Sequence, residues 1–158
     1  LYRALEQAGV AIWIDGGWAV DAVVGHQTRP HTDLDIAVEE RFLTMLRQCL
    51  SGRGYGEVAS GEGSPWNFVL EDGERRRVDV HVVVLDAQGG VWAEPVAGIA
   101  YPASSLTGEG FIAGAPVRCV RAEFLLQFKT SYPPRVIDRQ DVAVLCGVLG
   151  RPVPGTHK

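Results

Sequence analysis

The glycine pair and the acid pair within residues 13–38 constrain the fold of this chain more than any other feature. In WIDGGWAVDAVVGHQTRPHTDLDIAV, Gly16 and Gly17 interrupt an apolar segment where a strand should pass into a helix. Asp33 and Asp35 then place two carboxylates on what otherwise reads as a buried strand. Glycine weakens helices and strands, and a buried carboxylate needs a partner. The stretch therefore indicates a local requirement other than packing.

Apolar periodicity and the positions of glycine and proline predict a mixed α+β fold and not a regular βαβ alternation. We expect helices at residues 1–8, 18–24, 39–50, 123–130 and 137–149. We expect strands at residues 10–14, 33–38, 55–59, 66–70 and 76–85, and a second hairpin within residues 109–120. Residues 86–105 are rich in glycine, proline and alanine and are expected to be mostly loop. The predicted architecture is a mixed central sheet flanked by helices, with a short C-terminal helical part.

The composition fits one globular domain in a reducing compartment. The chain has 158 residues, and its longest apolar runs are far shorter than the roughly 20 residues of a membrane span. Its three cysteines are far apart and lack metal-ligand spacing, so we expect buried thiols and a cytoplasmic location. A net charge of −4 without a basic stripe argues against a nucleic-acid partner. The chain opens on Leu1 in an already helical pattern, so we expect the natural N-terminus to lie upstream.

Two acids on one strand face suggest a metal site. Asp33 and Asp35 lie two residues apart, so both carboxylates point to one face while Leu34 and Ile36 point to the other. Two anions about 7 Å apart on one strand repel each other in a partly dry site. A hard divalent cation such as Mg²⁺ relieves the repulsion. Taken alone, the pair fits an exposed edge strand with two solvated acids equally well or better.

The glycine pair and the loop that follows it could bind an anion. A Gly-Gly turn before a helix lets backbone N–H groups approach a phosphate closely. Arg29 and His31 add cationic donors just ahead of the acids. The simpler interpretations are a tight turn that needs positive φ, and a solvated loop.

The segment RRRVDVHVVV carries a third acid. Asp79 and His81 lie on one face of a predicted strand whose other face is valine. If this strand pairs beside the strand at residues 33–38, Asp79 completes a three-carboxylate cluster that could bind a metal or accept a proton from a hydroxyl. The alternative for Asp79 is an ion pair with an arginine at residues 75–77. His81 either orients a ligand or is a satisfied polar residue at the end of the sheet.

Together these motifs resemble a known superfamily. DGGWAVDAVVGHQTRPHTDLDIAV is similar to the signature of the DNA polymerase β-like nucleotidyltransferases. The resemblance to the lincosamide nucleotidyltransferases covers nearly the whole chain, through TRPHTDLDIAV, WNFVL, VDVHVVVLD, YPASSLTGEG and DRQDVAVLC. GFIAGAPVRC also resembles the aminoglycoside 2″-nucleotidyltransferases. Lys129 in FKTSYPP and the loop ASGEGSP at residues 59–65 depart from the lincosamide pattern.

The resemblance implies an activity and a set of residue roles. Asp33 and Asp35 would hold two Mg²⁺ ions on the phosphates of ATP or another nucleoside triphosphate, and Asp79 would ligate a metal or act as general base. The residues implied at the triphosphate are Gly16, Gly17, Arg29 and His31. The product implied is a nucleotidyl ester, with the adenylyl ester favoured, on an antibiotic hydroxyl, together with pyrophosphate. Lincosamide is favoured over aminoglycoside as the acceptor.

The same resemblance sets expectations for organisation and partners. Residues 1–106 would form the polymerase β-like catalytic core, and residues 107–158 a hairpin and helices packed on it in one unit. The aromatic side chains expected around the drug are Trp18, Trp66, Trp92 and Tyr101, with His81 beside them, although each could be core instead. A homodimer could complete the pocket. Two rival functions stay open: a toxin-like enzyme that modifies protein or RNA, and an inactive nucleotide-binding module.

Overall fold

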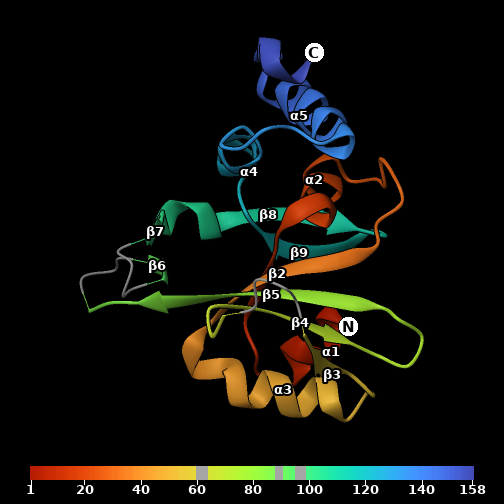
Figure 1. Ribbon diagram of the computed structural model, residues 1–158, viewed down its shortest axis with the longest axis vertical. Helices are drawn as coiled ribbons and strands as arrows, with labels where there is room; N and C mark the ends of the chain where they lie inside the picture. Colours follow the sequence, from red (N-terminus) through yellow and green to blue (C-terminus); the bar gives the residue numbers. More distant parts are fainter. Residues whose placement is uncertain (60–63, 88–90, 95–98) are drawn as a thin grey trace.

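The computed structural model describes residues 1–59, 64–87, 91–94 and 99–158, and residues 92, 94, 99 and 100 by their backbone alone. It contains a mixed sheet with helices on both sides (Figure 1). The strands are β1 (Ile12–Ile14), β2 (Asp33–Glu39), β3 (Gly56–Val58), β4 (Asn67–Glu71), β5 (Arg77–Leu85), β6 (Val91–Glu94), β7 (Ile99–Tyr101), β8 (Gly108–Ile112) and β9 (Ala115–Cys119). The helices are α1 (Tyr2–Gln7), α2 (Gly16–Val24), α3 (Leu43–Ser51), α4 (Ala122–Lys129) and α5 (Val136–Leu149). The predicted α+β class is confirmed.

The sheet places β2 and β5 at its centre. Its main strand order is β3-β4-β5-β2-β1-β9-β8, and β6 and β7 extend from β5. β2 runs parallel to β5 and antiparallel to β1, and β1 runs parallel to β9. The condition on which the acid cluster depended, pairing of the strand at residues 33–38 with the strand that carries Asp79, is therefore met. Both predicted hairpins, β4–β5 and β8–β9, are present.

The helices divide between the two sides of the sheet. In Figure 1, α1 and α3 lie below the sheet, and α2, α4 and α5 lie above it. The core joins alternate residues of the strands, such as Ile12, Ile36 and Val80, to Leu46 and Leu50 of α3. Because side chains alternate along a strand, every second residue of β2 and β5 points to the other side of the sheet, toward α2 and α4.

Three local predictions were wrong. α2 begins at Gly16 and not at residue 18, because the Asp15 carboxylate accepts the Gly16 N–H at 2.7 Å and caps the helix there. Residues 86–105 are not mostly loop, since β6, β7 and a 3₁₀ turn at Ala103–Thr107 lie among them. The helix expected at residues 39–50 begins as a 3₁₀ turn, Glu40–Phe42, before α3.

The remaining sequence expectations concern cysteines and membrane spans. Cys119 and Cys146 are buried, Cys49 is half-buried, and all three are unpaired thiols. Within the described residues, no helix combines the length and apolar character needed to cross a bilayer. Of the loop at 59–65, residues 60–63 lie outside the described part of the chain.

Candidate active site

The two glycines at the start of α2 allow side chains to approach the backbone closely. Gly16 has φ +59°, and a Cβ there would lie 1.9 Å from Asp35 Oδ2. A Cβ on Gly17 would lie 2.5 Å from both Arg29 Nη2 and His31 Nδ1. Real Cβ atoms do not make such contacts, so only glycine permits this packing. The glycine pair thus brings an acid of β2 and the loop before it against the first turn of α2.

The acids of β2 and β5 meet because the two strands are parallel and in register. Asp35 lies opposite Asp79, and Ala37 lies opposite His81. His81 Nε2 is 3.7 Å from Asp35 Oδ1. One ligand atom from each of Asp35, Asp79 and His81 lies within 4.8 Å of the others, which is close enough for a single metal ion. The structure therefore brings together two of the predicted acids and the predicted histidine.

Asp79 has an unsatisfied oxygen. Its Oδ1 is buried and accepts no hydrogen bond from the described residues. Burial raises the pKa of Asp79, the neighbouring His81 opposes the rise, and Asp35 and Asp33 add to it. An orphaned carboxylate oxygen among other acids is the donor environment that a hard divalent cation satisfies. The residues present therefore fit an oxygen-preferring metal ion.

His81 supplies positive charge to the same cluster. Burial lowers its pKa, but Asp35, Asp15 and Asp79 outweigh that effect and raise the pKa to about 9. At neutral pH the metal-free protein therefore holds a charged imidazole among its carboxylates. A bound cation would replace that charge, and the neutral ring could then act as a ligand.

Asp33 stands apart from this group. It lies at the exposed start of β2, opposite Arg77, and lines the same cavity as Asp35. Burial and the Asp35 carboxylate raise the pKa of Asp33, while Arg29 and His31 lower it. Asp33 is thus near the acids but outside the three-residue set that could share one ion.

A cavity of about 490 Å³ opens above the acids. Its floor is acidic and comes from the sheet and the start of α2: Asp15, Asp33, Asp35 and Asp79. Its opposite side carries cations from the loop before β2 and from the α4–α5 region: Arg29, Lys129 and Arg135. Apolar and aromatic side chains complete it: Tyr101, Leu125, Phe128, Tyr132 and Ile137. Opposite charges on facing walls suit an anion that carries its own cations.

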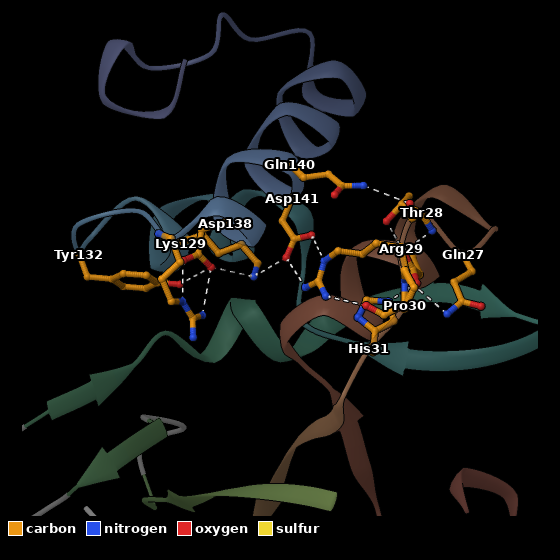
Figure 2. A network of polar contacts seen from close by, with 12 residues as sticks. Gln27, Thr28, Arg29, Pro30, His31, Lys129, Tyr132, Asp138, Gln140 and Asp141 are labelled. Atoms are coloured by element: carbon orange, nitrogen blue, oxygen red, sulfur yellow. Dashed lines mark hydrogen bonds and ion pairs between the residues drawn. The ribbon is translucent and has the colours of Figure 1, made fainter. Parts of the chain in front are cut away.

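The cationic side is ordered by two buried aspartates of α5 (Figure 2). Both carboxylates have fully buried side chains. Asp141 accepts from Arg29 Nε and Nη2, each at 2.8 Å, and lies 2.8 Å from Lys129 Nζ. Asp138 accepts from Arg135 and from the Tyr132 hydroxyl. The network links the loop before β2 to the α4–α5 region, 112 residues away in the case of Arg29 and Asp141.

Three of the predicted site residues, His31, Trp18 and Trp66, do not line the acidic cavity. His31 is almost buried, its Nε2 is 2.5 Å from Asp21 Oδ2, and its ring lies 4.6 Å from the Trp18 ring. His31 and Trp18 line a separate, more apolar cavity of about 420 Å³ that shares Asp33 with the first. His31 therefore braces the loop against α2.

The predicted aromatic residues differ in their positions. Tyr101 lines the acidic cavity and donates its hydroxyl to Asp15 Oδ2 at 2.7 Å. Burial and Asp15 raise the pKa of Tyr101. Trp66 packs against the core and does not line that cavity. The side chain of Trp92 lies outside the described part of the structure.

Sequence reasoning missed one acid of the cavity, the position of Lys129 in it, and the two buried aspartates that pair with its cations. Asp15 directly precedes the glycine pair, and its position as a helix cap was a usable signal. Asp138 and Asp141 stand one turn apart in an otherwise apolar helical pattern, which indicates buried partners. Nothing local to Lys129 reveals that it faces the acids, because its place depends on how α4 packs on α2.

Comparisons with known proteins identify the family of this chain. The family model described as Aminoglycoside-2''-adenylyltransferase matches residues 1–145. A 2''-aminoglycoside nucleotidyltransferase of Escherichia coli is 35% identical over 125 residues, which cover 75% of this chain and 63% of that protein. The chain thus spans less than two thirds of the length of that relative. A lincosamide resistance protein of Staphylococcus haemolyticus is 29% identical over 139 residues, or 87% of this chain and 84% of that one.

Solved structures give the same result for the fold. The lincosamide antibiotic adenylyltransferase LnuA, with lincomycin bound, matches with a TM-score of 0.80 and 26% identity over 92% of each chain. ANT(2")-Ia in complex with adenylyl-2"-tobramycin matches with a TM-score of 0.73 and 24% identity, over 94% of this chain and 84% of that one. The likeness to the second shows the nucleotidyltransferase fold. With the match over residues 1–145, the chain belongs to the aminoglycoside-2''-adenylyltransferase family.

Proposed function

We propose that this protein transfers a nucleotidyl group, the adenylyl group of ATP in particular, to a hydroxyl of an antibiotic and releases pyrophosphate. The observation that carries the proposal is the alignment of Asp35, Asp79 and His81 beside the glycine turn of α2, with the orphaned Asp79 oxygen among them. Acids that need a cation and a backbone that admits close approach are the parts that phosphoryl chemistry requires. The family match and the names of the relatives support the same reaction.

Divalent metal would be held by Asp35 and Asp79, with Asp33 at the open side and His81 as a further donor. Two Mg²⁺ ions would supply charge neutralisation for the phosphates and for the attacking and leaving oxygens. Asp79 either shares the metals or accepts the proton of the drug hydroxyl. Burial raises the pKa of Asp79, which makes it a stronger proton acceptor than an exposed aspartate.

The triphosphate would lie between the acidic floor and the cationic side. Gly16 and Gly17 open α2, and Arg29 Nη2 lies against Gly17. Lys129 approaches from α4. In the reaction, the drug oxygen bonds to the α-phosphorus, the bond from that phosphorus to the bridging oxygen breaks, and pyrophosphate leaves with those cations as counter-charges.

A lincosamide acceptor fits this cavity better than an aminoglycoside. The aromatic and aliphatic surface of Tyr101, Phe128 and Ile137 suits the apolar part of a lincosamide. The chain also covers 84% of the lincosamide resistance protein, against 63% of the aminoglycoside relative.

The test is an assay for pyrophosphate released from ATP when Mg²⁺ and one drug at a time are present. We expect release with a lincosamide, less or none with aminoglycosides, and none without a drug. Asp35→Asn should lower the rate on the order of 100-fold or more, since it removes a charge that the transition state needs. Release with no drug specificity, or a label from ATP that stays on protein or RNA, would refute the proposed acceptor.

A further inference from the structure

We infer that Asp141 is a positioning residue, which holds Arg29 and Lys129 together as one phosphate-binding pair. This inference rests on the proposed function, because it takes the cationic side of the cavity as the place of the triphosphate. Asp141 does not line the cavity itself and pairs with two cations that do, Arg29 and Lys129. Its role therefore depends on what it does to its two partners.

The geometry of Asp141 is a two-sided clamp. One face of the carboxylate accepts the Nε and Nη2 groups of Arg29, both at 2.8 Å, in a bidentate pair. Its Oδ2 is also 2.8 Å from Lys129 Nζ. The Asp141 side chain is fully buried, whereas the side chains of Arg29 and Lys129 are 13% and 10% exposed. Only the two cations therefore reach the cavity.

The clamp fixes groups that the chain would not otherwise bring together. Arg29 comes from the loop between α2 and β2, Lys129 from the last turn of α4, and Asp141 from α5 (Figure 2). Arg29 and Asp141 are 112 residues apart in the sequence. Without a shared anion, a guanidinium and an ammonium so close together would repel each other and separate. The carboxylate thus sets both their spacing and their direction.

Arg29 also contacts the first turn of α2, where the phosphates would lie. The place that a Cβ of Gly17 would occupy is 2.5 Å from Arg29 Nη2, so the guanidinium lies against the first turn of α2. Gln140 Nε2, on the same helix as Asp141, donates to Thr28 O at 3.1 Å and ties down the start of the loop. α5 therefore holds the loop at two points and aims Arg29 at the turn where the phosphates would lie.

Binding of inorganic tripolyphosphate with Mg²⁺, measured by calorimetry on the full chain, tests the inference without any drug or transfer step. We expect Asp141→Asn to weaken binding roughly 10–100-fold, the range seen when a supporting partner of a ligand group is removed. The matched control is Asp72→Asn. Asp72 is also buried and paired with an arginine, Arg76, at 2.6 Å, but it lies in the β4–β5 turn away from this cavity.

The control separates positioning from general loss of stability. Asp72→Asn should lower the melting temperature and leave tripolyphosphate affinity unchanged. Equal affinity of Asp141→Asn and the unmodified protein would overturn the inference, and so would an equal loss in both variants. No binding of tripolyphosphate by the unmodified protein would overturn it as well. If the unmodified protein binds tripolyphosphate tightly but modifies no drug in the pyrophosphate assay, the proposed acceptor is refuted and the inference about Asp141 stands.

A second variant decides the matter if Asp141→Asn does not fold. Arg29→Lys keeps the charge but cannot make the two-point contact with Asp141. We expect weaker tripolyphosphate binding, and in turnover a raised KM for MgATP with an unchanged KM for the drug. A variant with unaltered affinity would show that charge alone matters and would overturn the clamp. A change in the drug KM alone would do the same.

Discussion

At the scale of single residues, the glycine pair explains more than a turn. The sequence suggested that Gly16 and Gly17 line a phosphate path, and the structure adds a reason that holds in the absence of ligand. Asp35, Arg29 and His31 occupy the space that a Cβ would need. The cost of glycine in a helix is therefore offset by the contacts that it permits.

Gly16→Ala should disable the site. The new Cβ would collide with Asp35 Oδ2, so Asp35 must move away from Asp79. A displacement of about 1 Å in a catalytic group costs roughly 100-fold in rate. Pyrophosphate release in the drug assay measures this, together with thermal unfolding.

Gly25→Ala is the matched control for that substitution. Gly25 also has a positive φ, of +82°, but a Cβ there would meet nothing within 4 Å. The Gly25→Ala protein should lose about 1–2 kcal/mol of stability from backbone strain alone and keep its activity. If both variants kept full activity, the close approach of Asp35 would not matter for catalysis.

His81 should make the stability of the metal-free protein depend on pH in a definite direction. Folding raises its pKa from 6.5 to about 9, as Asp35 and the other acids outweigh burial. The stabilisation is therefore fully present below pH 6.5 and is lost as the pH rises through 9. Denaturant unfolding between these values, in the presence of a chelator, measures the slope. The slope should diminish in Asp35→Asn, and an unchanged slope would contradict the assignment.

At the scale of elements, alternation along the strands could be predicted and the packing of distant helices could not. The faces of β2 and β5 follow from a period of two residues, so Asp35 and Asp79 were expected on one side if the strands paired. Residues 86–105 were misjudged because weak strands such as β6 and β7 depend on the neighbour that they extend. The contribution of Lys129 was equally hidden, since it depends on the packing of α4.

Asp138 should contribute to the stability of α5 in a pH-dependent way. It closes a capping box with Arg135 at the start of the helix. Burial opposes its ionisation, but hydrogen bonds from Arg135 and Tyr132 lower its pKa to about 2. Its contribution is present above pH 3.8 and is lost as the pH falls through 2.

Asp138→Asn therefore tests this element. We expect a loss of about 1–3 kcal/mol at pH 7, where charged hydrogen bonds are removed but Arg135 can still reach water. Unfolding of both proteins as a function of pH should show the difference shrinking on acidification. A difference that stayed constant from pH 7 to pH 2 would contradict the role of the ionised carboxylate.

At the scale of the whole molecule, the sheet provides the acids, and α4, α5 and the loop before β2 provide the cations. The sequence motifs located the first half, since it lies within two strands and a turn. The second half has few local signals, because buried ion pairs such as Arg29–Asp141 join residues from opposite parts of the chain. The resemblance to known enzymes indicated the family and fold better than it indicated the residues that line the cavity.

Ligand binding should stabilise the entire fold. Mg²⁺ with a non-hydrolysable ATP analogue at 100 times its dissociation constant should add about 2.7 kcal/mol, or about 5–10 °C in melting temperature. The shift should need both components and should be small in Asp79→Asn, which removes the orphaned oxygen. Differential scanning calorimetry measures the shift in melting temperature. A full shift in Asp79→Asn would exclude Asp79 from the metal site.

The long separation between Arg29 and Asp141 also has a consequence for biosynthesis. Within this stretch of chain, the acids of β2 and β5 emerge from the ribosome well before α5 does. Because a growing chain folds from its N-terminal side, the sheet can assemble while the loop before β2 still lacks its anchor. The nascent protein would thus expose a repelling group of carboxylates until the last helix arrives. If the cavity binds nucleotide as proposed, that capacity would appear late, in one step, as α5 docks.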